Sequence, residues 1–109
     1  MLKRKLILLL LLPIFGFSQI EVKVFNAGWN KANDVTWVNQ LKDVKTIGYT
    51  DVAKHTKSQT KYKIAVVPTI IIFKDGEEVA RFQADLSFKM IATKEEVQEE
   101  IDNIIMSDF

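Results

Sequence analysis

Residues 66–82 carry the pattern that most restricts how this chain can fold. Pro68 is followed by five β-branched or aromatic residues, a composition typical of a strand that is buried on both faces. An Asp-Gly pair then supplies a two-residue turn that favours positive φ, and a half-polar run follows it. The pattern predicts a β-hairpin with Lys74 opposite Glu77. Pro68 has no amide hydrogen, so it is expected at the start of the strand.

The N-terminal segment has the features of a secretory signal peptide. Lys3-Arg4-Lys5 precedes an apolar run over residues 6–17, and Ser18-Gln19 follows it. The run is shorter than the about 20 residues that a membrane-spanning helix needs, and an uncleaved anchor is the alternative. We therefore expect residues 1–18 to be a signal peptide, residues 19–109 to form one domain, and the protein to be exported, periplasmic or secreted. Membrane contact is expected only through an uncleaved leader.

Composition narrows the classes of function. Three of the 15 basic residues lie in the leader, which leaves 12 against 14 acidic ones, so the surface is not the strongly basic one that nucleic acid requires. The chain has no cysteine and one histidine, His55. No clustered ligands or paired base and nucleophile stand out. The sequence therefore predicts no metal, no cofactor, no nucleic acid and no catalytic residue.

The spacing of apolar residues predicts a helix over residues 29–44. Val35, Val38 and Leu41 follow one another at intervals of three and form a stripe along one helical face. An asparagine near the start, Asn30 or Asn33, is expected to cap it. Trp37 falls off this stripe, so we expect it to be partly buried at a helix–loop junction, with a second contact site as the alternative.

Alternation and capping signals predict the remaining elements. Thr93-Lys94-Glu95-Glu96 has the form of a capping box before an apolar-striped helix. The apolar segment 83–92 is expected to fold back over the core as a lid, or else to be a partner-docking loop. The other predicted elements are strands at 20–25 and 46–52 and a helix at 56–63.

The resulting order is β-α-β-α-β-β-α. Strands that are separated by helices imply parallel pairing of the first three strands, and the hairpin then adds an antiparallel fourth.

Two stretches carry a family resemblance. Residues 61–77 read Lys-Tyr-Lys-Ile-Ala-Val-Val-Pro-Thr-Ile-Ile-Ile-Phe-Lys-Asp-Gly-Glu, which resembles the K-Y-x-I-x-x-x-P-T-hydrophobic-F-K-x-G stretch of the thioredoxin family. Residues 25–29 read Phe-Asn-Ala-Gly-Trp and are similar to the start of that family's active-site helix. The resemblance covers residues 20–105. It implies a minimal α/β thioredoxin-like fold, with a central mixed sheet, helices on both faces and a cis peptide bond before Pro68.

The chain departs from the family where the chemistry would lie. Asn30 and Asn33 stand at the positions of the two cysteines, and an amide cannot replace the thiolate that performs disulfide exchange. By the same resemblance, Val24 replaces a buried aspartate and Tyr49 replaces its lysine partner. We therefore expect a redox-inactive protein- or peptide-binding, chaperone-like module. A thioredoxin-group disulfide oxidoreductase and a structural subunit of an envelope assembly are the alternatives.

The candidate site combines the degenerate motif with the segment around Pro68. In the family, the residue before the cis proline pairs with the backbone of an extended peptide, and a backbone contact survives the loss of the thiols. The predicted partner is thus a protein or peptide. The degenerate motif comprises Trp29, Asn30, Lys31, Ala32 and Asn33, and the peptide-binding residues are Trp29, Val67, Pro68 and Thr69.

Overall fold

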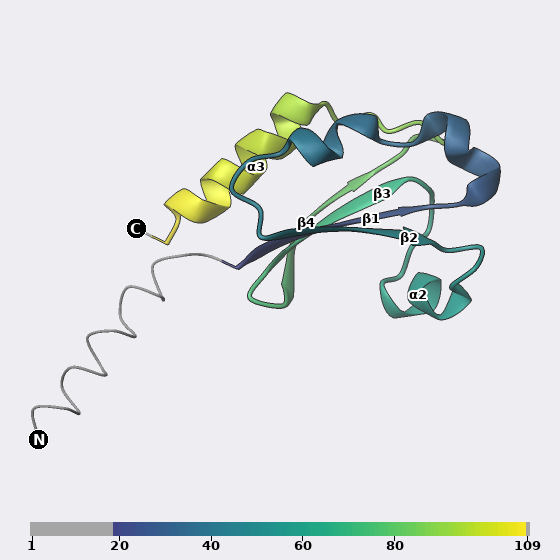
Figure 1. Ribbon diagram of the computed structural model, residues 1–109, viewed down its shortest axis with the longest axis horizontal. Helices are drawn as coiled ribbons and strands as arrows, with labels where there is room; N and C mark the ends of the chain where they lie inside the picture. Colours follow the sequence, from purple (N-terminus) through teal and green to yellow (C-terminus); the bar gives the residue numbers. More distant parts are fainter. Residues whose placement is uncertain (1–18, 109) are drawn as a thin grey trace, which may run out of the picture.

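A four-stranded mixed sheet organises the computed structural model, which describes residues 19–108 (Figure 1). The strands lie in the order β2-β1-β3-β4. The predicted signal peptide falls outside the described residues. The strands are β1 (Ile20–Asn26), β2 (Thr46–Asp51), β3 (Thr69–Lys74) and β4 (Glu77–Gln83).

The predicted hairpin is present as β3 and β4. Asp75 and Gly76 have φ values of 52° and 86°, the two positive angles that a type I′ turn requires. Lys74 lies opposite Glu77, as predicted, and β3 is buried along nearly its whole length. The register shifts by one residue near Val79. This bulge is the one irregularity of the hairpin.

The prediction that the first three strands are parallel is wrong. β1 is parallel to β2 but antiparallel to β3. The connection from β2 contains a single helix, α2 (Thr56–Lys61), whose six residues span about 9 Å at 1.5 Å per residue. The connection does not return along the sheet: Asp51 at the end of β2 lies beside Asn26, and Thr69 at the start of β3 lies beside Phe25. β3 therefore starts at the end of the sheet where β2 stops.

The prediction of one α-helix over residues 29–44 is also wrong. The segment forms two 3₁₀ helices, η1 (Gly28–Asn33) and η2 (Thr36–Gln40). The stripe of Val35, Val38 and Leu41 is buried as expected, but its strict interval of three is the period of a 3₁₀ helix. Asparagine, aspartate and threonine in this stretch also compete with helical hydrogen bonding through their side chains.

Neither asparagine caps the start of a helix. The residues before η1 and η2 are Ala27 and Val35, and neither provides a side-chain cap. Asn30 instead lies inside η1, where its φ/ψ angles are not helical.

The two remaining helix predictions are confirmed. α2 covers most of the predicted residues 56–63, and α3 (Lys94–Met106) begins at the predicted capping box. The Thr93 side chain accepts from the Glu96 amide, and the Glu96 carboxylate accepts from the Thr93 amide. Val97 and Ile101 on the apolar face of α3 are completely buried.

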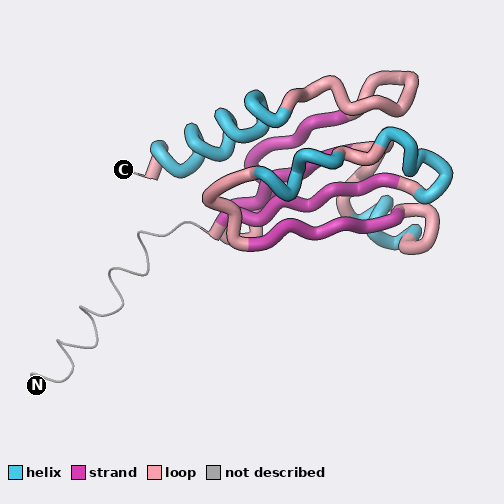
Figure 2. Tube along the Cα trace, turned by 45° about the horizontal axis from the view of Figure 1, so that its top comes forward, coloured by secondary structure: helices cyan, strands magenta, loops and turns pink. Residues whose placement is uncertain are grey.

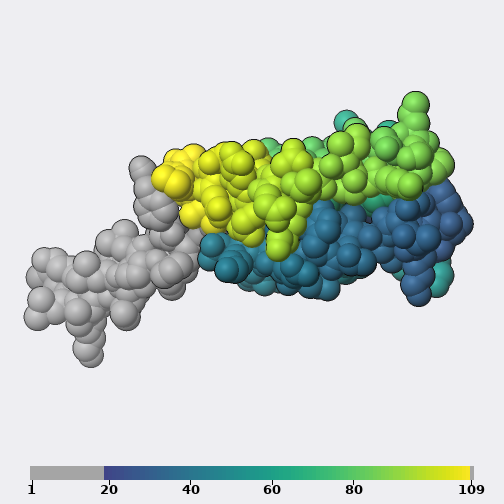
Figure 3. Space-filling view, turned by 90° about the horizontal axis from the view of Figure 1, so that it is seen from above, coloured from purple at the N-terminus to yellow at the C-terminus, as the bar shows by residue number. Residues whose placement is uncertain are grey.

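The sheet separates two apolar clusters. One face packs against η2 and α3, which lie side by side along it (Figure 3). Trp37 is partly buried against this cluster. The opposite face carries a smaller cluster centred on Phe25, with Ile64 and Tyr62 from the α2–β3 connection.

Segment 83–92 is only in part the predicted lid. Met90 and Ala92 pack against the larger cluster, and Ala84 pairs with Met90 through an isolated bridge. Leu86 is 96% exposed and Ile91 67% exposed, so the tip of the segment projects from the domain. Among the described helices, none has the length and apolar character needed to cross a bilayer.

Candidate functional site

The degenerate motif and the Pro68 segment meet at one end of the sheet. β1 leads into η1, which carries Trp29 and Asn30, and β3 starts just after Pro68. Because β1 and β3 are antiparallel, with Phe25 opposite Thr69, the last residues of β1 lie beside the first residues of β3. The structure therefore brings the two predicted parts of the site together.

A hollow of about 170 Å³ opens between these parts, and we call it the Trp29 pocket. Trp29 is 66% exposed on its rim. The Trp29 ring meets the Phe88 ring edge to face, with centroids 5.2 Å apart. The residues lining the pocket are mainly apolar: Trp29, Val52, Ala53, Gln59, Ile64, Ala65, Val66, Val67 and Phe88.

Val67, one of the residues that line this pocket, has backbone groups without an internal partner. The Val67–Pro68 peptide bond is cis. The Thr69 hydroxyl donates to the Val66 carbonyl at 2.6 Å, and the Ala84 amide donates to the Pro68 carbonyl at 3.0 Å. Within residues 19–108, the Val67 amide and carbonyl form no hydrogen bond. The neighbours of Val67 are thus held in place while its own backbone groups stay available.

The four predicted peptide-binding residues differ in whether their side chains are buried or line the pocket. Pro68 and Thr69 have fully buried side chains, so they shape the backbone instead of contacting a ligand directly. Trp29 and Val67 both line the pocket. Of the four predicted residues, these two belong to the pocket wall.

The Asn30 side chain is buried, at 5% exposure, and forms hydrogen bonds with three other residues. Its amide nitrogen donates to the Asn26 side-chain oxygen at 3.0 Å and to the Phe88 carbonyl at 3.1 Å. Its side-chain oxygen accepts from the side-chain nitrogen of Asn33 at 2.8 Å. Both donor hydrogens and one acceptor site are therefore occupied. The side chain at the first cysteine position joins β1, η1 and the 84–90 loop.

Asn26 completes this network. Its side-chain nitrogen donates to the Asn30 carbonyl and to the Asp34 carboxylate. Buried amides remain stable when their hydrogen bonds are made, and no buried side-chain nitrogen or oxygen among residues 19–108 lacks a partner. Asn33 contributes one hydrogen bond and is partly exposed.

Sequence reasoning missed Asn26 and Phe88 as site residues. In the sequence, Asn26 follows the predicted strand over residues 20–25 and lies in the Phe-Asn-Ala-Gly-Trp stretch, and Phe88 is one of several apolar residues in segment 83–92. The sequence separation of 58 between Asn30 and Phe88 explains why no local pattern revealed their contact.

Lys31 and Ala32 lie away from the Trp29 pocket, and both are exposed. Lys31 borders a second hollow of about 190 Å³, together with Tyr49, Asp34 and Asp51. Burial and the charge of Asp34 raise the pKa of the Tyr49 phenol. The degenerate motif is thus divided between two sides of η1.

Val24 and Tyr49 are neighbours across the β1–β2 pair. Val24 is 1% exposed and belongs to the larger apolar cluster. No carboxylate stands at this point of β1. The pair has no acidic group that could move a proton toward Asn30.

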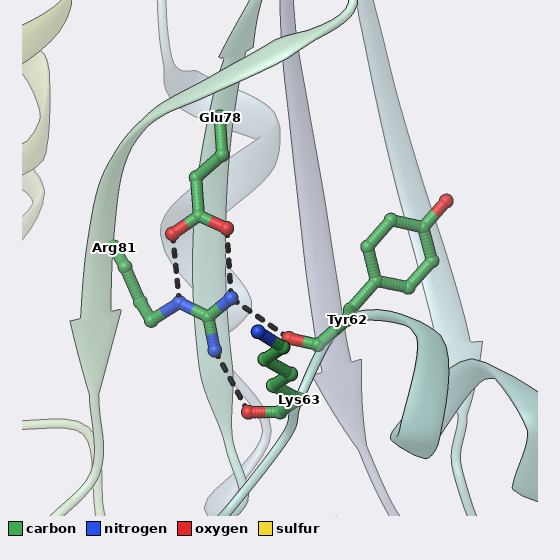
Figure 4. Close-up of polar contacts among 4 residues, drawn as sticks. All are labelled: Tyr62, Lys63, Glu78 and Arg81. Atoms are coloured by element: carbon green, nitrogen blue, oxygen red, sulfur yellow. Dashed lines mark hydrogen bonds and ion pairs between the residues drawn. The ribbon is translucent and has the colours of Figure 1, made fainter.

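Arg81 fixes the segment that leads into the pocket (Figure 4). Its guanidinium donates to both carboxylate oxygens of Glu78, at 2.8 and 2.9 Å. It also donates to the carbonyls of Tyr62 and Lys63, at 2.7 and 3.0 Å. These two carbonyls lie just after the last residue of α2, where a helix leaves backbone carbonyls without a helical partner. Hydrogen bonding by Arg81 lowers the pKa of Glu78, and hydrogen bonding to Glu78 raises the pKa of Arg81.

No group of three or more metal-ligating side chains comes together within residues 19–108. His55 is exposed at the start of α2 and makes no side-chain cap. This part of the chain therefore offers no ligand set for a metal.

No family model matches the chain. Over 51 residues it is 41% identical to thioredoxin Y1 of Arabidopsis thaliana, a chloroplast protein, covering 47% of this chain and 30% of that one. Over 36 residues it is 44% identical to a thioredoxin of Chlamydia pneumoniae, covering 33% of this chain and 35% of that one. The chain thus spans about a third of the length of the curated relatives it matches.

Solved thioredoxin structures share the fold over most of the chain. A malaria parasite thioredoxin-2 superposes with a TM-score of 0.63 at 18% identity, over 79% of this chain and 84% of that one. A thioredoxin of Halobacterium salinarum gives 0.61 at 18% identity, over 84% and 79%. These similarities show that the chain has a thioredoxin-like fold, and the sequence contains no cysteine.

Proposed function

We propose that this protein is a redox-inactive, chaperone-like module that binds extended segments of other proteins at the Trp29 pocket. The observation that carries the proposal is the free backbone of Val67 beside a 66% exposed tryptophan. An extended peptide that pairs with a free backbone edge gains affinity from main-chain hydrogen bonds and specificity from pockets for its side chains.

The size of the Trp29 pocket indicates what a bound segment would insert. Its volume is about 170 Å³, and an engineered apolar cavity of about 150 Å³ accepts benzene. One aromatic or branched aliphatic side chain therefore fits. Aromatic residues such as Trp29 and Phe88 are enriched in recognition surfaces because they bury a large area with few rotatable bonds.

Disulfide reduction is not supported by the chain's own side chains. The sequence contains no cysteine, and the thiolate is the nucleophile of that reaction. The Asn30 side chain, at the position of the first cysteine, is already engaged in three hydrogen bonds. An insulin reduction assay separates the two functions: we expect no turnover by the purified protein, and turnover would overturn the proposal.

The binding test compares pocket variants with a matched control in the same segment. Trp29→Ser and Phe88→Ser remove residues that line the pocket, whereas Leu86→Ser removes a 96% exposed residue that does not. A photo-crosslinker at Val66, which is half-buried in the pocket wall, is used to capture unfolded client proteins and extended peptides.

We expect capture by the unaltered pocket and by Leu86→Ser, and at least a tenfold loss in Trp29→Ser and Phe88→Ser, about the effect of losing one well-packed aromatic contact. Circular dichroism confirms that each variant is folded. Equal capture by all variants, or none by the unaltered protein, would show that the pocket is not a binding site.

We also propose that the protein acts outside the cytoplasm, periplasmic or secreted, after removal of residues 1–18. The support is the basic start and short apolar run of the sequence. Mass spectrometry of the protein from a secreting host tests this. A mature N-terminus near Gln19 is expected, and an intact leader on all of the protein would refute removal.

A further inference from the structure

The two edges of the sheet are protected to very different degrees. The β4 edge carries Glu77, Glu78 and Arg81 and is bent by the bulge at Val79. Charges and bulges are the usual devices that stop an edge strand from pairing with another chain. The β2 edge has neither between Thr46 and Thr50, and its register with β1 is regular. In Figure 2, β2 forms the lower rim of the sheet.

The hydrogen bonding of β2 shows which of its backbone groups are free. The Val52 amide donates to the Asn26 carbonyl of β1. Since backbone groups alternate in direction along a strand, those of Thr50 and Gly48 also face β1. The amides and carbonyls of Ile47 and Tyr49 therefore point away from the sheet. No described strand of residues 19–108 pairs with this side of β2.

The β2 sequence is complementary to itself when read in the opposite direction. Placed antiparallel to a second copy about Gly48, Ile47 comes opposite Tyr49 of the other copy. Thr46 comes opposite Thr50, and the flanking Lys45 comes opposite Asp51. Aromatic with β-branched, threonine with threonine, and opposite charges are the favourable cross-strand pairs. No like charges meet in this register.

We propose that two copies of this chain pair through their β2 edges, antiparallel and about a two-fold axis at Gly48, to form one continuous sheet. The outward groups of Ile47 and Tyr49 then exchange hydrogen bonds with those of Tyr49 and Ile47 in the second copy. Such an interface is isologous, as a two-fold dimer requires.

Side-chain exposure supports this arrangement. Tyr49 is 53% exposed and Ile47 is half-buried, and both lie on the sheet face that holds the larger apolar cluster. Pairing places each Tyr49 beside an Ile47 of the second copy and covers both. Gly48 has no atom within 4 Å of an added Cβ position, so the sheet face at this position has room for an introduced side chain.

The dimer does not depend on the proposed binding function. The Trp29 pocket is lined by no residue of β2, so a pair of chains would present two pockets. A failure of peptide capture would leave the dimer untouched, and a failure of dimerisation would leave capture untouched.

The absence of cysteine permits a direct test with single introduced thiols. Gly48→Cys places two thiols across the proposed axis, in a pair that is not hydrogen-bonded. Cα atoms in such pairs are about 4.5 Å apart, within the roughly 4.4–6.8 Å that a disulfide spans. Val79→Cys places a thiol on the β4 edge at 42% exposure and serves as the control. Both proteins are oxidised in a dilute glutathione buffer.

Light scattering over a range of concentrations gives the oligomeric state of the purified, unaltered protein. We expect the mass to rise from one chain to two. Tyr49→Lys should weaken the dimer at least about tenfold, because a lysine on an edge opposes pairing, while Val79→Lys should not. Gly48→Cys should crosslink much faster than Val79→Cys. A mass of one chain throughout, or equal crosslinking at the two edges, would overturn the proposal.

Discussion

Replacing Asn30 by alanine tests whether the network around it supports the fold. The substitution removes three hydrogen bonds, two donated and one accepted, from a side chain that is 5% exposed. Each such bond contributes about 0.5–1.5 kcal/mol, so the free energy of unfolding should fall by about 3 kcal/mol. That is a large part of the about 5–15 kcal/mol of an ordinary domain. For a domain of this size it lowers the Tm by about 12–24 °C.

Urea unfolding followed by far-ultraviolet circular dichroism measures this loss. Asn33→Ala is the matched control because it removes one hydrogen bond of the same network from a partly exposed side chain, and should cost below about 1 kcal/mol. A loss of less than about 0.5 kcal/mol in Asn30→Ala, within the usual range of surface substitutions, would refute the reasoning.

Asn30→Asp adds a pH dependence to the same experiment. An ionised carboxylate cannot donate to the Phe88 carbonyl or the Asn26 oxygen that the amide now contacts. Only the Asn33 side chain would still donate to the new carboxylate, and a buried charge with so few donors is costly, so the variant should be the least stable of the three at neutral pH. Burial raises the pKa of such a carboxyl group, and its stability should recover relative to the unaltered protein as the pH falls. A deficit that does not change with pH would contradict this.

Four further predictions concern the contacts that hold the fold around the site. Arg81→Gln should lower the free energy of unfolding by about 2 kcal/mol, since charged hydrogen bonds contribute about 1.5–3 kcal/mol, and chemical denaturation measures it. The pKa of Glu78 is lowered in the folded protein. Its carboxylate therefore stabilises the fold above its ordinary pKa of 4.5, and this contribution is lost as the pH falls through the folded value. The difference in the free energy of unfolding between the unaltered protein and Glu78→Gln should vanish in acid. Gly76→Ala, at φ 86°, should destabilise by about 1 kcal/mol, whereas Gly48→Ala, with open space at its Cβ position, should be neutral or slightly stabilising in the same assay. Thr93→Ala should cost about 1 kcal/mol by removing the cap of α3, and an unchanged Tm would contradict the capping box.

Local sequence signals predicted the elements whose stabilising contacts are close in the chain. The hairpin turn needs only two adjacent residues that accept positive φ, and Asp75 and Gly76 provide them. The capping box of α3 joins Thr93 and Glu96, three residues apart. These elements could be predicted because the interacting residues lie at a short, fixed spacing in the sequence.

The same reasoning failed where a local pattern had two interpretations. An interval of three between Val35, Val38 and Leu41 fits the face of an α-helix and also a 3₁₀ helix. The structure has two short 3₁₀ helices in this stretch, and polar side chains such as Thr36 and Asn39 favour them because they compete with α-helical hydrogen bonding. The direction of β3 depends on the end of the sheet at which the chain re-enters it after α2, and the apolar and polar pattern of residues 52–68 does not encode this.

The sequence by itself determined the thioredoxin-like frame and the loss of thiol chemistry, because the motif around Pro68 and the missing cysteines are properties of the chain alone. Only the tertiary structure decided what replaced that chemistry. Asn30 bonds to Phe88, 58 positions away, and the Trp29 pocket forms from segments that meet only because β1 and β3 run in opposite directions. Contacts between distant segments depend on how the sheet is assembled, and no local spacing encodes them.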